Sequence, residues 1–201
     1  VGNLFDVLRA TGDFDGALTP LDGLDPEGLP PQQRTSLQMV KMTVTRYRED
    51  PALIRREVDR LAALTVDSPD LQARYYALVF RAVAAGLDED HAAAFDLSEQ
   101  ARDENPMGSG EWLFPAGEAA IWMRDVGRLA RVRDALAARG PLGRMYAAWS
   151  IELGAAQDAL EGRTAEALAG FEEARARWAE LGLKLHLAHN RIHLSLLSPG
   201  T

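Results

Sequence analysis

The balance between helix formers and strand formers constrains this chain more than any other feature. Its 201 residues include 33 Ala and 28 Leu, against only 10 Val and 4 Ile. Ala and Leu are among the strongest helix formers, whereas Val and Ile favour strands. A β-sandwich, a β-barrel or a parallel sheet would need many more strand formers. The composition therefore predicts an all-α protein.

Charge and cysteine content exclude several functional classes. The formal net charge is −8, so we expect no broad basic surface for nucleic acid or anionic lipid. The chain contains no Cys, which removes disulfides, thiolate metal sites and thiol nucleophiles, and suits a reducing cytoplasm. Neither a membrane-spanning run nor a signal-peptide pattern is found. We expect a cytoplasmic protein that binds neither nucleic acid nor membrane through this chain.

The two ends of the chain and its amino-acid composition suggest its origin. It begins at Val1 and ends in Ser-Pro-Gly-Thr, which we interpret as an excised piece of a longer protein. Arg supplies 20 of the 22 basic residues, and together with the Ala excess this is typical of a GC-rich bacterial genome. No convincing internal boundary is seen, so we expect a single domain over residues 1–201.

Helix-breaking residues recur with a regular period. Pro51 suits a helix start, Asp70 suits an N-cap, and Gly86, Gly140 and Gly162 suit helix ends. Turns expected near residues 12, 49, 86, 127 and 162 are 37, 37, 41 and 35 residues apart. An all-helical period of this length predicts about five helix-turn-helix hairpins that stack side by side, followed by a C-terminal cap helix.

The last repeat resembles a tetratricopeptide (TPR) unit. It lies between Ala148 and Leu181 and contains the stretch GRTAEALAGFEEARARW, in which Ala167, Phe171 and Ala174 follow Gly162 at signature spacings. The resemblance implies a TPR-like right-handed α-solenoid with Phe171 wedged between hairpins. An irregular helical bundle with chance spacing is the alternative.

A longer stretch, Ala147 to Leu197, resembles the C-terminal helical region of large actinobacterial regulators. Those proteins combine a STAND-type ATPase module, sometimes with a class III adenylate or guanylate cyclase domain or a DNA-binding domain, with a TPR-like arm. The resemblance implies a role in signalling or transcription regulation, with the chemistry outside this region.

Catalytic motifs are missing from the sequence. It contains no G-x-x-x-x-G-K-[ST] phosphate loop, no G-x-S-x-G elbow and no H-E-x-x-H zinc motif. We therefore expect no enzymatic activity, no catalytic residue and no cofactor.

Three histidines form the one arrangement that could hold a metal. His186, His189 and His193 are spaced i, i+3 and i+7, so their imidazoles share one helix face. No acidic residue lies between Leu181 and Thr201 to support such a site. The simpler interpretation puts the histidines on the exposed side of a final helix whose buried side carries Leu185, Ala188, Ile192 and Leu196. We expect no metal, with the three histidines as weak candidates.

The first helix of each hairpin is expected to line the concave surface of a solenoid. Large apolar side chains there would bind an amphipathic helix or an extended peptide. The predicted partner-binding residues are Met39, Arg46, Tyr76, Phe80, Phe114, Ile121, Arg124, Trp149 and Glu152. Burial of these side chains in the inter-helix core is the alternative.

The sequence thus favours a non-catalytic arm for protein–protein interaction within a larger bacterial regulator. Its partner would be a protein or peptide segment, including other domains of the same polypeptide. The alternative function is a helical domain that senses a small molecule or peptide.

Overall fold

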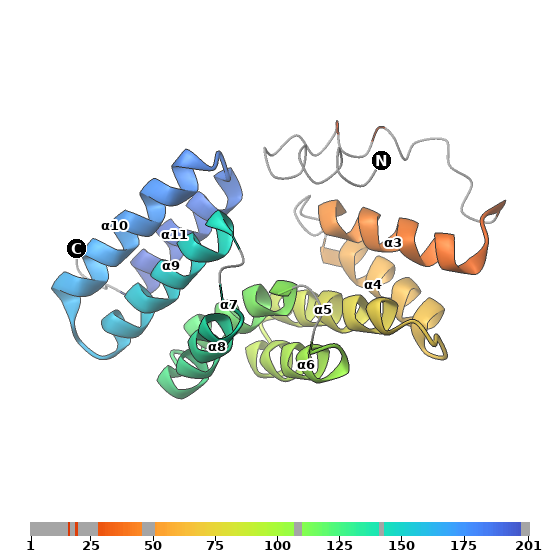
Figure 1. The fold of residues 1–201 in the computed structure, drawn as a ribbon, viewed down its shortest axis with the longest axis horizontal. Helices are drawn as coiled ribbons and strands as arrows, with labels where there is room; N and C mark the ends of the chain where they lie inside the picture. The colour runs from red at the N-terminus through yellow and green to blue at the C-terminus, as the bar shows by residue number, and fades with distance from the viewer. Residues whose placement is uncertain are drawn as a thin grey trace. The chain divides into compact units, whose positions relative to one another are not determined.

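The computed structural model describes residues 16, 19, 28–45, 51–106, 110–140 and 143–197 (Figure 1). Helix accounts for 85% of these described residues, and none of them lies in a strand. The all-α prediction is therefore confirmed for the described part. None of the helices within it is long and apolar enough to cross a membrane.

The chain divides into two compact units, Val1–Ala116 and Gly117–Thr201. The described helices of the first unit are α3 (Pro31–Thr45), α4 (Pro51–Thr65), α5 (Leu71–Leu87) and α6 (His91–Glu104), with the short 3-10 helix η3 (Gly110–Trp112). Helix α7 (Leu113–Trp122) contains the boundary between the units. The second unit continues with α8 (Val126–Ala138), α9 (Arg144–Leu160), α10 (Thr164–Glu180) and α11 (Lys184–Leu197).

In the first unit, each helix packs against its neighbour along the chain. Helix α4 contacts both α3 and α5, and α5 contacts α6. Helix α3 also contacts α5, so a helix here packs against the next helix but one as well. A core of Met42, Ile54, Val58, Leu61, Ala77, Phe80 and Ala84 joins α3, α4 and α5.

The second unit has the same order of packing. Helix α9 contacts α8, α10 and α11, and α10 also contacts α11. The α9–α10 pair is close because Gly170 lies against Ala155: a Cβ at Gly170 would be 2.8 Å from the Ala155 Cβ. Phe171 is completely buried in this unit, as the sequence predicted.

Most of the predicted helix boundaries are confirmed. Helix α4 begins at Pro51, and the Asp70 carboxylate caps α5 by accepting a hydrogen bond from the Gln72 backbone N–H at 2.9 Å. Gly162 lies in the turn after α9. Its φ is +80°, a left-handed conformation that residues with a Cβ resist.

Two expected turns lie elsewhere. Helix α5 runs through Gly86 to Leu87, and the turn expected near residue 127 lies at residues 123–125. The second shift arises because the Asp125 side chain accepts a hydrogen bond from the Arg128 backbone N–H at 2.9 Å and so begins α8 before Gly127. The turns expected near residues 12 and 49 lie outside the described residues.

Candidate functional site

The buried face of α11 is unusual because it is mainly polar. The buried residues of this helix are Asn190, His193 and Leu197. Asn190 donates a hydrogen bond to the Phe171 carbonyl of α10 at 3.3 Å. His193 is 1% exposed. Since buried polar groups need partners, the surroundings of His193 must supply them from other helices.

Both ring nitrogens of His193 face carboxylates. The Nδ1 atom lies 2.7 Å from Glu152 Oε1 of α9, and the Nε2 atom lies 2.8 Å from Glu118 Oε2 of α7. A neutral imidazole has only one N–H, so it would direct a lone pair at one of these carboxylates. The geometry therefore favours the doubly protonated imidazolium, which donates to both.

Each of the two carboxylates has a second donor. Trp178 Nε1 of α10 donates to Glu152 Oε2 at 2.6 Å, and His189 Nδ1 donates to Glu118 Oε1 at 2.9 Å. The indole of Trp149 lies near the His193 ring, with centroids 6.2 Å apart. We call Glu118, Glu152, Trp178, His189 and His193 the His193 cluster. It joins α7, α9, α10 and α11.

Burial and charge act in opposite directions on the cluster. Burial alone would lower the pKa of His193, but the charge of Glu118 and the hydrogen bonds to both carboxylates raise it to about 10. Burial would raise the pKa of Glu118, but the charges of His193 and His189 hold it well below its usual range. Against the effect of burial, Glu118 also raises the pKa of His189. Near neutral pH, His193 therefore stays protonated and Glu118 stays ionised, and we call this arrangement a charged clamp.

The three histidines do not form the metal site that their spacing allowed. His186 stacks on Trp178 with ring centroids 4.5 Å apart, and both nitrogens of His193 are directed at carboxylates. Within the described residues, no group of three His, Asp or Glu side chains is arranged to hold a metal ion.

The expected orientation of α11 is wrong. His193 is buried, whereas Ala188 is exposed and Ile192 is 46% exposed. The reason is that Glu118 and Glu152 form strong hydrogen bonds with the imidazolium in the interior. These contacts outweigh the burial of two more apolar side chains.

In the first unit, three of the predicted groove residues come together as core. Phe80 is 2% exposed, and Met39 and Tyr76 are half-buried against the same apolar cluster. The Tyr76 and Phe80 rings stack with centroids 6.0 Å apart, and the Tyr76 hydroxyl donates to Glu111 Oε1 at 3.1 Å. Phe114 is half-buried, and Arg46 lies outside the described residues.

In the second unit, most predicted groove residues are also buried. Ile121 is 0% exposed, Trp149 2% and Glu152 1%. Arg124 is exposed, and its Nη2 donates to the Leu196 carbonyl at the end of α11, at 2.7 Å. Phe80, Ile121, Trp149 and Glu152 therefore do not line an open groove in this structure. Their apolar or hydrogen-bonding faces are taken up by neighbouring helices.

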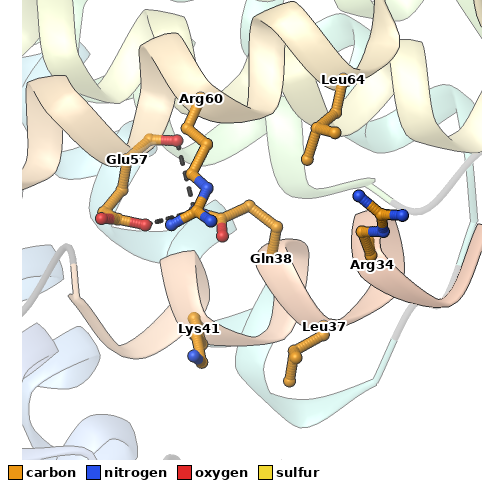
Figure 2. A pocket seen from close by; sticks show the side chains of 7 residues that line it. All are labelled: Arg34, Leu37, Gln38, Lys41, Glu57, Arg60 and Leu64. Carbon is orange, nitrogen blue, oxygen red and sulfur yellow. Dashed lines mark hydrogen bonds between the residues drawn. The ribbon is translucent and has the colours of Figure 1, made fainter. Parts of the chain in front are cut away.

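A hollow of about 200 Å³ lies between α3 and α4 in the first unit. Gln38 Nε2 joins the two helices there by donating to Glu57 Oε2 at 2.6 Å (Figure 2). Figure 2 shows Arg34 and Leu64 toward one end of the hollow and Glu57 toward the other. Its lining is Arg34, Leu37, Gln38, Lys41, Glu57, Arg60 and Leu64, three cations against one carboxylate.

Sequence reasoning missed Glu118 and Trp178, which complete the His193 cluster. A signal for Glu118 was present: it is the single charged residue in the ten-residue helix Leu113–Trp122. A lone carboxylate in so apolar a helix needs a partner when it packs against other helices.

Comparison with known proteins gives no relative. No family model matches the chain, and no curated protein or solved structure matches it either.

Proposed function

We propose that this chain is a non-catalytic, TPR-like helical-repeat arm that binds a protein or peptide segment within a larger bacterial regulator. The order of helix packing is the observation that carries the proposal. Helices α3, α4 and α5, and separately α9, α10 and α11, contact both their neighbours along the chain and the next helix but one. Stacked helical hairpins share this order, since no hairpin buries its apolar face alone.

Two further features support a binding role over a catalytic one. The motifs that cradle phosphate or activate a nucleophile are missing from the sequence. Among the described residues, His193 and Glu118 have strongly shifted pKa values, and they hydrogen-bond to each other and to side chains from neighbouring helices. We interpret the His193 cluster as a clamp that gives the last helix one fixed orientation.

The regulatory context rests on the resemblance of residues 147–197 to the arms of STAND-type regulators. The gene sequence upstream of the codon for Val1 tests this part. An ATPase or cyclase module encoded there supports the proposal, and a start codon immediately before Val1 contradicts it.

The non-catalytic part is tested with the purified chain. We expect no hydrolysis of ATP or GTP and no formation of cyclic nucleotide above a buffer blank. Turnover that co-purifies with the chain through two chromatographic steps, and that scales with its concentration, would overturn the proposal.

The α3–α4 hollow favours a second candidate, a domain that senses a small anionic molecule. Three of the residues that line it are cationic and one is acidic, in a chain of net charge −8. Under this alternative, citrate should raise the melting temperature of the chain, and Arg60→Ala should reduce that rise. An identical rise in the variant would show that citrate acts elsewhere.

A further inference from the structure

The orientation of α11 leaves an apolar stripe on its solvent side. Leu185, Ala188, Ile192 and Leu196 are spaced i, i+3, i+7 and i+11 and therefore follow one face of the helix. Ala188 and Ile192 are exposed, and Leu185 and Leu196 are half-buried. We call these four residues the α11 stripe. Lys184, Arg191 and Ser195 are also exposed, so the outer face of α11 combines this apolar stripe with polar side chains.

The end of α7, in the same unit, carries a large exposed side chain. Arg124 Nη2 donates to the Leu196 carbonyl at 2.7 Å, so the end of α7 lies close to the C-terminal end of α11. Trp122, two residues before Arg124, is 43% exposed. Exposed aromatic side chains are typical anchors of protein interfaces.

Charge indicates what would cover the stripe. Helix α11 contains Lys184 and Arg191 but no acidic residue, although the whole chain carries a net charge of −8. Both cations are on the exposed side of the helix. An apolar stripe with a basic border is complementary to an apolar stripe with an acidic border.

The chain already contains a helix of that kind. Helix α10 covers both α9 and α11 and buries Ala167, Phe171, Ala174 and Trp178. Its sequence contains four Glu and two Arg, so its net charge is −2. Helix α11 would accept a second helix of this type on its outer side, much as α9 accepts α10.

We propose that the α11 stripe, together with Trp122, is a docking surface for an amphipathic helix with acidic flanks from a protein partner. This inference rests on the proposed protein-binding function and names its surface and the chemistry of its partner.

A labelled peptide of residues 164–180 serves as the probe, because its apolar spacing and its acidic flanks are those that the stripe should select. Its binding to the whole 201-residue chain is measured by fluorescence anisotropy. The matched control peptide has its four Glu replaced by Gln. We expect saturable binding of the acidic peptide, at least tenfold weaker binding of the control, and loss of that difference at high salt.

Variants of the chain locate the binding surface. Ile192→Asp places a carboxylate in the stripe and should weaken binding of the acidic peptide at least tenfold, and Trp122→Ala should weaken it severalfold. Val66→Asp, at a 74% exposed position of the first unit, is the control and should bind as the wild type does. Before binding is measured, each variant must show the circular dichroism spectrum and melting midpoint of the wild type. We expect this because each substituted side chain is exposed.

Three results would overturn the inference. These are no binding of the acidic peptide, equal binding by the Ile192→Asp variant, and a wild-type dimer in sedimentation that Ile192→Asp dissociates. The last would assign the stripe to a second copy of the chain. Equal binding by the Ile192→Asp variant would mean that the peptide binds another surface, and the proposed protein-binding function would remain. Nucleotide turnover by the chain would contradict that function independently of the peptide result.

Discussion

Replacing Glu152 with Gln tests the central argument about the His193 cluster. The Glu152 carboxylate accepts from Trp178 through one oxygen and from His193 through the other. An amide has one oxygen and one NH2 group, so it can accept from only one of these donors. The other donor would then face the amide NH2 group in the interior. The substitution changes almost no volume, so packing is preserved.

The expected loss follows from the burial of the pair. A hydrogen bond to a charged group contributes about 1.5–3 kcal/mol, and removing one partner of a buried ion pair costs about 3–5 kcal/mol. His193 keeps Glu118 as its second partner, at 2.8 Å. We therefore expect Glu152→Gln to lower the free energy of unfolding by about 3 kcal/mol near neutral pH.

The pH dependence gives a readout that a packing defect would not change. The pKa of His193 is raised from an ordinary 6.5 to about 10 in the folded protein. Its stabilising contribution is therefore complete below pH 6.5 and is lost as the pH rises toward about 10, by up to about 1.4 kcal/mol per pH unit. Glu152→Gln removes one cause of the raised pKa. Its penalty should thus be largest below pH 6.5 and should shrink as the pH rises.

The assay is urea unfolding of wild type and variant, followed by circular dichroism at several pH values between about 6 and about 10. Glu172→Gln is the matched control, because the Glu172 side chain on α10 is 63% exposed, and it should cost less than about 0.5 kcal/mol. A loss below about 1 kcal/mol for Glu152→Gln, or a penalty independent of pH, would refute the charged clamp.

Four other changes test the second unit, all by urea unfolding. Phe171→Ala removes a side chain that is 0% exposed and should cost about 3–5 kcal/mol, whereas a loss below about 1 kcal/mol would place Phe171 outside the core. Gly117→Ala would bring a Cβ within 2.7 Å of Trp149 Cζ2 and should cost about 1–3 kcal/mol; no loss would show that the indole shifts freely. Gly162→Ala should cost about 1 kcal/mol because φ is +80°, and a neutral effect would argue against the left-handed turn. Because the pKa of Glu118 is lowered, the free energy of unfolding of the wild type should fall as the pH drops below 4.5, and Glu118→Gln should weaken that dependence. If the variant loses stability in acid as steeply as the wild type, other carboxylates cause the loss.

The fold class and many helix boundaries were predictable because local chemistry decides them. The excess of Ala and Leu over Val and Ile favours helix throughout the chain. Pro51 and Asp70 begin helices through their own backbone and side-chain groups, and Gly162 adopts the left-handed turn that glycine favours. Phe171 was placed correctly in the core because its spacing from Gly162 marks the inner face of one helix.

The groove residues were only partly predictable. The sequence placed Phe80 and Trp149 on the inner sides of first helices, but both side chains are buried there. An apolar stripe that packs in a core and one that lines an open groove have the same periodicity. Which of the two exists depends on the helices that pack against it.

The sequence by itself determined that residues 184–197 form an amphipathic helix, because the period of its apolar residues is local. Only the tertiary structure decided which of its faces is buried. The partners of His193 lie 41 and 75 residues earlier in the chain, at Glu152 and Glu118, and Trp178 holds Glu152 in place. Periodicity alone favours burying Ile192. Two carboxylates that need a cation, the buried Glu152 and the half-buried Glu118, reverse that preference, since a charge removed from water is stable only when it is paired.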